Sequence, residues 1–240
     1  MSRRPWRRSE VSLRRAGRVK TGLGPLDTLL GGGFPCGAVS LVYGEATTGK
    51  TTLALTAALN HLAEHRAAKT IYIDSDNKLN TGRLTQIAEP RGEGLLRRLH
   101  LHMPLSFGEQ ETTMEQMPAL DPMDFVVLDS VTGLYRGETV DEERTYRVNK
   151  ELNRQLGYIS EMAGRSGAAF LLTGQVRSVM ESSQIEPVAP RLLSYWSSTI
   201  LKLEKTPGQG RRQATLEKPI TSPNTINIWI TETGASASQP

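Results

Sequence analysis

Two glycines, a lysine and a threonine have the spacing of a phosphate-binding loop, Gly44-x-x-x-x-Gly49-Lys50-Thr51. Glycine lets the backbone turn tightly, so that successive N–H groups can point at phosphate oxygens. The ammonium of Lys50 would reach the terminal phosphates of a nucleotide, and the hydroxyl of Thr51 would ligate Mg²⁺. The alternative is an ordinary glycine turn. Such a turn would not need the apolar run that precedes this motif or the helix-forming residues that follow it, so these flanking segments favour the phosphate-binding loop. The spacing therefore predicts a nucleoside triphosphate site formed by Gly44, Glu45, Ala46, Thr47, Thr48, Gly49, Lys50, Thr51 and Thr52.

A carboxylate ends a second apolar run, Phe125-Val126-Val127-Leu128-Asp129. In enzymes with a phosphate-binding loop, a carboxylate at such a strand end holds the Mg²⁺ ion. The alternative is an acid that only ends a strand, and the loop upstream favours the metal role. Asp129 is therefore predicted to hold Mg²⁺ together with Thr51.

Two further polar residues follow apolar runs and could serve hydrolysis of the terminal phosphate. Asp76 lies just beyond the run 71–74, where loops of open α/β sheets face their ligand, so its carboxylate could orient an attacking water. Gln175 follows the run 171–173 and could sense the same phosphate and pass its state to residues 176–190, which we expect to be mobile. A solvated acidic turn and a long connecting loop are the alternatives. The predicted catalytic residues are Lys50, Asp76 and Gln175.

Alternating apolar runs and amphipathic segments must position these groups. Strands are expected at 38–43, 70–74, 99–103, 125–129 and 168–173, and helices at 50–65, 81–88, 108–117 and 142–165. This order predicts an α/β fold with a mainly parallel central sheet, helices on both faces and right-handed crossovers. Alternation of apolar and polar residues then predicts antiparallel strands at the sheet edge, at 200–205, 211–218 and 225–231.

Positive charge is concentrated at the N-terminus. The 240-residue chain has a formal net charge of +4, whereas residues 1–20 alone carry +7 and the remainder therefore −3. Basic arms of this kind often contact nucleic acid, and a solvated end is the alternative. We expect a basic, flexible tail at 1–20, a single domain at 21–234 and a disordered tail at 235–240.

Composition excludes several other classes of protein. No apolar run approaches the roughly 20 residues of a membrane-spanning helix, so no membrane partner is expected. Cys36 is the only cysteine, which excludes an internal disulfide and a cysteine-rich zinc site. These features favour an intracellular, cytoplasmic location.

With these motifs placed, the chain resembles the RecA-type recombinase ATPases from about residue 21 to residue 233. The resemblance rests on 21–27 with 29–33, the phosphate-binding loop, Asp129-Ser130-Val131-Thr132-Gly133-Leu134-Tyr135-Arg136 and Thr173-Gly174-Gln175-Val176. The opening motifs are shared with KaiC-like ATPases, so the C-terminal stretches 195–205 and 211–216 are more discriminating. The resemblance implies a RecA-like P-loop ATPase core, ATP and Mg²⁺ as cofactors, and DNA repair and recombination at the nucleoid.

The resemblance also implies roles for individual positions. Asp76 falls where the recombinases have a water-activating glutamate, and Gln175 matches a glutamine that precedes their second DNA-binding loop. Arg83 matches an arginine that stacks on adenine. The two DNA loops would fall near 137–147 and 177–191, which implies DNA contacts from Arg136, Arg144, Arg147, Arg177 and Arg191.

Three departures from the family pattern argue against a full strand-exchange enzyme. Asp76 is one methylene shorter than glutamate, and a misplacement of about 1 Å can cost on the order of a hundredfold in rate. Residues 1–20 are too short to replace the family's helical DNA-binding domain. Leu13-x-x-Ala16 is a poor substitute for the Phe-x-x-Ala polymerisation motif.

The expected function is an ATP-binding accessory protein of homologous recombination with weak ATPase activity. It would bind single-stranded or branched DNA and assist a main recombinase of the RadA type, and a homo-oligomer is left open. Two alternatives remain: a KaiC-like signalling ATPase that acts through protein contacts, and an active recombinase ATPase that DNA stimulates.

Overall fold

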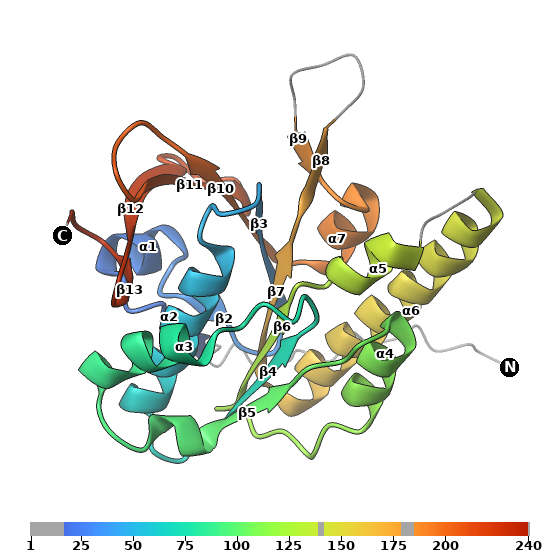
Figure 1. Cartoon of the computed structure of the whole chain (residues 1–240), viewed down its shortest axis with the longest axis horizontal. Helices are drawn as coiled ribbons and strands as arrows, with labels where there is room; N and C mark the ends of the chain where they lie inside the picture. Colours follow the sequence, from blue (N-terminus) through green and yellow to red (C-terminus); the bar gives the residue numbers. More distant parts are fainter. Residues whose placement is uncertain (1–16, 139–141, 179–184, 240) are drawn as a thin grey trace, which may run out of the picture.

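One nine-stranded sheet runs through the computed structural model, which describes residues 17–138, 142–178 and 185–239 (Figure 1). The strand order is β13-β12-β11-β10-β3-β7-β6-β4-β5. The parallel part contains β10 (Thr199–Lys205), β3 (Val39–Gly44), β7 (Ala169–Gly174), β6 (Phe125–Asp129), β4 (Thr70–Asp74) and β5 (Leu99–His102). β11 (Arg211–Lys218), β12 (Thr225–Thr231) and β13 (Gly234–Ser236) extend it antiparallel. The α/β fold class predicted from the sequence is confirmed.

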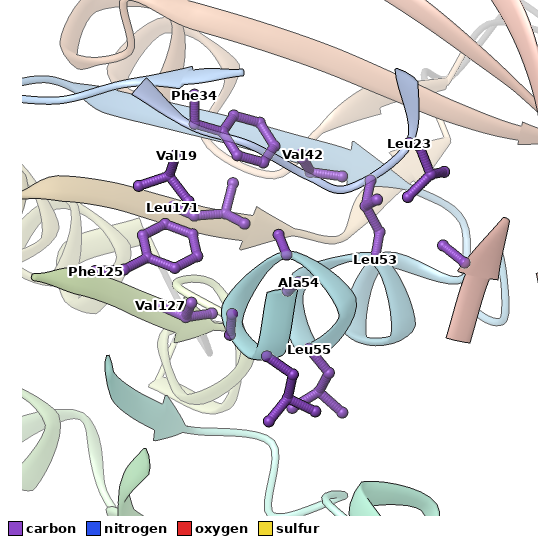
Figure 2. Packing of buried hydrophobic residues seen from close by; sticks show 14 of the residues in the cluster. Val19, Leu23, Phe34, Val42, Leu53, Ala54, Leu55, Phe125, Val127 and Leu171 are labelled. Atoms are coloured by element: carbon purple, nitrogen blue, oxygen red, sulfur yellow. The ribbon is translucent and has the colours of Figure 1, made fainter. Parts of the chain in front are cut away.

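Helices cover both faces of the parallel strands, which are buried along their whole length in β3, β4, β6 and β7. One face packs against α1 (Gly24–Leu29), α2 (Lys50–Glu64) and α3 (Thr81–Ala88), and Figure 2 shows Leu53 of α2 near Val42 of β3. The other face packs against α4 (Phe107–Glu115), α5 (Gly133–Glu138), α6 (Glu142–Ser166) and α7 (Pro190–Trp196). Side chains that alternate along a strand therefore enter two separate cores.

The long helix α6, predicted at 142–165, buries one apolar face against the sheet. Leu152, Leu156, Ile159 and Ala163 are each at most 1% exposed. They recur at helical spacing and pack on the sheet, whereas Arg154 and Arg165 on the opposite side are exposed. Packing of this stripe, more than helix propensity, stabilises the 25-residue helix.

Several short elements were not predicted. Besides α1, α5 and α7, they include β1 (Arg18–Val19), β2 (Phe34–Pro35), β8 (Val176–Ser178), β9 (Ile185–Pro187) and the 3₁₀ turns η1 (Glu89–Arg91) and η2 (Leu95–Arg98). The segment 176–190, predicted as a connecting loop, contains an antiparallel hairpin formed by β8 and β9. Residues 179–184 lie outside the described part of the chain. Within that part, no helix has both the length and the apolar character to cross a membrane.

The expectation of a flexible tail at 1–20 is wrong for its last residues. Val19 is fully buried, and β1 pairs with β2. Arg18 donates two hydrogen bonds of 2.9 Å, to the carbonyl oxygens of Leu30 and Gly33. Residues 17–20 therefore belong to the folded domain, and residues 1–16 lie outside the described range.

The expectation of a disordered end after residue 234 is also wrong for β13. Ala235 is 8% exposed, and its N–H donates a 2.9 Å hydrogen bond to the hydroxyl of Thr56 in α2. That hydroxyl donates in turn to the carbonyl of Thr52 at 2.7 Å. The sequence does not predict β13, because its three residues are too few to show an alternating pattern of apolar and polar side chains. The last strand is thereby attached to the helix that follows the phosphate-binding loop.

Replacing Thr56 by valine tests this attachment. Thr56→Val keeps the shape of the side chain but leaves the buried N–H of Ala235 without an acceptor, so we expect the free energy of unfolding to fall by about 1–3 kcal/mol. Urea denaturation measures this loss, and amide hydrogen exchange at Ala235 should accelerate. Thr56→Ser keeps the hydroxyl and should stay within about 1 kcal/mol of the parent. Equal stability of the two variants would contradict the role of this hydrogen bond.

Candidate functional site

The predicted phosphate-binding loop connects β3 to α2 at the carboxyl edge of the sheet. Its two glycines are also required by close neighbours. A Cβ atom on Gly44 would overlap the carbonyl oxygen of Leu203, and one on Gly49 would overlap the side chain of Ile230. Gly49 has a φ of +97°, a conformation that favours glycine. The loop is therefore packed against β10 and β12 as well as being suited to turn around an anion.

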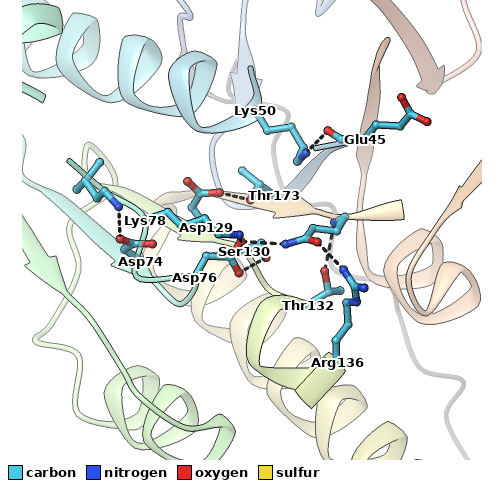
Figure 3. A network of polar contacts seen from close by, with 12 residues as sticks. Glu45, Lys50, Asp74, Asp76, Lys78, Asp129, Ser130, Thr132, Arg136 and Thr173 are labelled. Carbon is cyan, nitrogen blue, oxygen red and sulfur yellow. Dashed lines mark hydrogen bonds and ion pairs between the residues drawn. The ribbon is translucent and has the colours of Figure 1, made fainter. Parts of the chain in front are cut away.

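Lys50 lies over this loop and is only 9% exposed. Its ammonium donates a hydrogen bond to the carbonyl oxygen of Gly44 at 2.8 Å. It also donates to the carbonyl oxygen of Glu45 at 2.7 Å, as Figure 3 shows. Burial lowers the pKa of Lys50, and the carboxylates of Asp129 and Asp76 act in the opposite direction. The loop thus holds one cation close to the acids at the neighbouring strand ends.

Arg212 of β11 supports the same loop from outside, and sequence reasoning missed it. Its guanidinium donates to the carbonyl oxygens of Thr48 at 3.1 Å and Thr47 at 3.2 Å. Thr47 has a φ of 63°, so the arginine contacts the loop at a non-glycine residue in the left-handed conformation. No local pattern could reveal this contact, because 164 residues separate Arg212 from Thr48.

Asp129, the predicted metal-binding acid, is held in place by two hydroxyl groups. The hydroxyl of Tyr72 donates to one carboxylate oxygen at 2.7 Å. The hydroxyl of Thr173 donates to the other, as Figure 3 shows. Burial, followed by the charge of Asp129, raises the pKa of Tyr72 well above its usual range, so Tyr72 stays a neutral donor. The carboxylate therefore has a fixed orientation at the end of β6.

The structure brings the other two predicted catalytic residues together. The side-chain amide of Gln175 donates to Oδ2 of Asp76 at 2.9 Å, and the hydroxyl of Ser130 donates to Oδ1 at 3.0 Å. The ammonium of Lys78 also contacts Oδ2, at 2.9 Å. On its other side Gln175 accepts a 2.6 Å hydrogen bond from Arg136 of α5. Figure 3 shows Arg136 next to Thr132, below this group of side chains. A continuous chain of hydrogen bonds thus joins the ends of β4 and β7 to α5.

Asp74 fixes the loop that carries Asp76. It is 2% exposed, and its carboxylate accepts the backbone N–H of Leu79 at 2.7 Å. Burial raises the pKa of Asp74, whereas hydrogen bonds from the backbone of Leu79 and Lys78 act against that rise. The sequence pattern assigns no role to Asp74, whereas the structure shows that it holds the backbone of the loop after β4 in place.

Arg83 lies in α3, whose first turn is capped by Asn80. Its guanidinium donates to the carbonyl oxygens of Thr231, at 2.6 Å, and Glu232. Arg83 and Ile230 line a cavity of about 680 Å³. Because Ile230 also packs on Gly49, this cavity adjoins the phosphate-binding loop. The predicted base-contacting residue is therefore beside the predicted phosphate site.

The residues predicted to contact DNA fall into two groups. Arg136 and Arg191 line a cavity of about 890 Å³ together with Tyr146 and Lys150. Arg144 and Arg147 line a second cavity of about 480 Å³, where Arg144 forms a 2.5 Å ion pair with Glu138. Arg177 belongs to β8, and its side chain lies outside the described part of the chain, as do residues 139–141.

Comparison with known proteins agrees with this arrangement. The model of the Rad51 family matches residues 13–238. The DNA repair and recombination protein RadB of Thermococcus kodakarensis is 35% identical over 223 residues, which cover 90% of this chain and 97% of the relative. RadB of Methanococcoides burtonii is 33% identical over 214 residues, covering 88% of this chain and 93% of the relative.

A solved structure shows the same fold. The crystal structure of the RadB recombinase superposes with a TM-score of 0.76 at 32% identity, covering 92% of this chain and all of that chain. The chain belongs to the Rad51 family and, within it, to the RadB group of DNA repair and recombination proteins.

Proposed function

We propose that the protein binds Mg²⁺-ATP at the phosphate-binding loop, binds DNA, and assists a RadA-type recombinase with only slow ATP hydrolysis. One observation carries this proposal: Lys50, Asp129, Asp76 and Gln175 lie together at one edge of the sheet, joined by hydrogen bonds to their neighbours. Membership of the Rad51 family, a family of nucleotide-binding ATPases, supports the choice of ATP.

The side chains around the loop fit a nucleotide with its metal. Mg²⁺ prefers oxygen ligands and keeps several waters, so the hydroxyl of Thr51 and the carboxylate of Asp129 are suitable partners. Elsewhere in the described ranges, no three His, Cys, Asp or Glu side chains lie together to form a different metal site. When bound, Mg²⁺ would neutralise charge on the phosphates, while Lys50 contacts them and Arg83 lies beside the base.

The contacts of Asp76 favour slow turnover. Its oxygens already accept hydrogen bonds from Ser130, Gln175 and Lys78, and its side chain is a methylene shorter than glutamate. A water held by this carboxylate would sit too far from the phosphate for efficient in-line attack. ATP would thus act mainly by being bound, and hydrolysis would reset the protein.

The hydrogen bonds from Asp76 to Gln175 and from Gln175 to Arg136 would couple the nucleotide site to the side of the protein that we expect to face DNA. Gln175 precedes β8, and Arg136 lies in α5 beside the cavity that Arg191 also lines. A change at the terminal phosphate would therefore move both segments at once. Arginines in this region and in residues 1–16 would supply contacts to DNA phosphates.

Replacing Lys50 tests the nucleotide site. Lys50→Ala removes the cation that contacts the phosphates, and we expect affinity for Mg²⁺-ATP to fall on the order of a hundredfold in calorimetry. Lys20→Ala removes an exposed lysine that pairs with Glu64 at the far end of α2, and should bind like the parent. If the parent itself released no heat with Mg²⁺-ATP, the proposal would fail.

Lengthening Asp76 tests the explanation for slow hydrolysis. Asp76→Glu restores the missing methylene, so we expect steady-state phosphate release to rise by about ten- to a hundredfold at saturating ATP. Asp76→Asn has the parent's length without its charge and should not show the gain. Unchanged turnover in the glutamate variant would mean that side-chain length is not limiting.

Deleting residues 1–16 tests the DNA role of the basic arm and spares β1, which is part of the fold. We expect weaker binding to labelled single-stranded DNA in fluorescence anisotropy. The slope of log affinity against log salt should flatten by about 0.7 for each lost phosphate contact. An unchanged slope removes the arm from the mechanism, and an absence of DNA binding by the full chain favours a signalling ATPase that acts through protein contacts.

A further inference from the structure

Lys78 places a second ammonium among the acids of the proposed nucleotide site. Its Nζ atom lies 2.9 Å from Oδ2 of Asp76, and the lysine side chain is 71% exposed while that of Asp76 is 16% exposed. Figure 3 shows Lys78 and Asp76 in the same group of polar side chains as Asp129 and Ser130. An exposed ion pair of this kind contributes little to stability, so its position next to the site calls for another explanation.

The backbone of Lys78 is fixed although its side chain is exposed. Asp74 accepts the backbone N–H of Leu79, the residue after Lys78, at 2.7 Å. Asn77, the residue before it, has a φ of 51° and donates from its side chain to the carbonyl of Pro104 at 3.2 Å. The loop is thus held at its base, and the four-carbon stem of the lysine can still change rotamer at low cost.

The ammonium groups of Lys78 and Lys50 both interact with the carboxylate of Asp76. Burial lowers the pKa of Lys50 most, the carboxylates of Asp129 and Asp76 raise it, and the positive charge of Lys78 lowers it further. Two ammonium groups that repel each other beside these acids would both gain from an anion placed between them. A terminal phosphate is a better partner for an ammonium than the single charge of one carboxylate, because it offers more charge and more acceptor oxygens.

We propose that Lys78 contacts the γ-phosphate directly, pairing with Asp76 when no nucleotide is bound and moving to the phosphate when a triphosphate binds. This inference rests on the nucleotide site proposed above and makes that site selective for a triphosphate over a diphosphate. The move also releases Oδ2 of Asp76 from one of its two donors, leaving the amide of Gln175. Binding of the triphosphate would therefore change the hydrogen bonds of Asp76 even without hydrolysis.

The test compares a diphosphate with a non-hydrolysable triphosphate. Calorimetry measures the affinity of the parent and of Lys78→Met for Mg²⁺-ADP and for the Mg²⁺ complex of the β,γ-imido analogue of ATP. We expect the analogue to bind about five- to tenfold more weakly to Lys78→Met, a modest loss because the lysine is solvent-exposed. Affinity for Mg²⁺-ADP should stay within about twofold, and Lys78→Arg, which keeps the charge, should retain most of the preference.

Lys20→Met is the matched control, because Lys20 forms a 3.6 Å exposed ion pair with Glu64 at the opposite end of α2. It should leave both affinities unchanged. Equal losses for the two nucleotides in Lys78→Met, or no loss for either, would overturn the role of Lys78 while leaving the nucleotide site intact. If the parent binds neither nucleotide, the proposed function fails as well.

Discussion

The parallel pairing of β3, β7, β6 and β4 is the constraint on which the site depends. In a parallel sheet all carboxyl ends lie at one edge, so residues far apart in the sequence meet there. The strand order places the phosphate-binding loop after β3, Gln175 after β7, Asp129 at the end of β6 and Asp76 after β4. A shift of one residue in any of these pairings would turn a functional side chain to the other face of the sheet. Burial of both faces prevents such a shift. Packing in the two hydrophobic cores therefore fixes which side chains meet at the carboxyl edge of the sheet.

The antiparallel strands belong to the site as much as the parallel ones. Arg212 of β11 binds two carbonyl oxygens of the phosphate-binding loop, Ile230 of β12 packs on Gly49, and Ala235 of β13 is bonded to Thr56 of α2. The loop lies between these contacts and the strand ends that carry the acids. These contacts support the loop from outside, while the ammonium of Lys50 binds two of its carbonyl oxygens.

Sequence patterns located the chemical groups but not their supports. Apolar runs that end in Asp129 or Gln175 predict strand ends, and the rule for parallel sheets then predicts that those ends converge. Tyr72 and Thr173 orient Asp129 from neighbouring strands, and that relation depends on the strand order, which no run of residues contains. β1 and β13 are two and three residues long, too short to show a period, so the predicted tails wrongly include residues 17–20 and 235–236. Periodicity predicts an element only when the element is long enough to repeat.

The hydrogen bonds of Asp76, which we propose slow ATP hydrolysis, would also make the protein sensitive to the nucleotide that it binds. A carboxylate offers about four acceptor positions. Asp76 gives two of them to Ser130 and Gln175 and, when no triphosphate is bound, a third to Lys78. A general base needs an unoccupied acceptor position directed at the attacking water. A residue that transmits a conformational change needs hydrogen bonds to each element that must move. A longer glutamate could satisfy the first requirement by reaching past these donors. Asp76 satisfies the second, because the ends of β6 and β7 and its own loop all meet at one carboxylate.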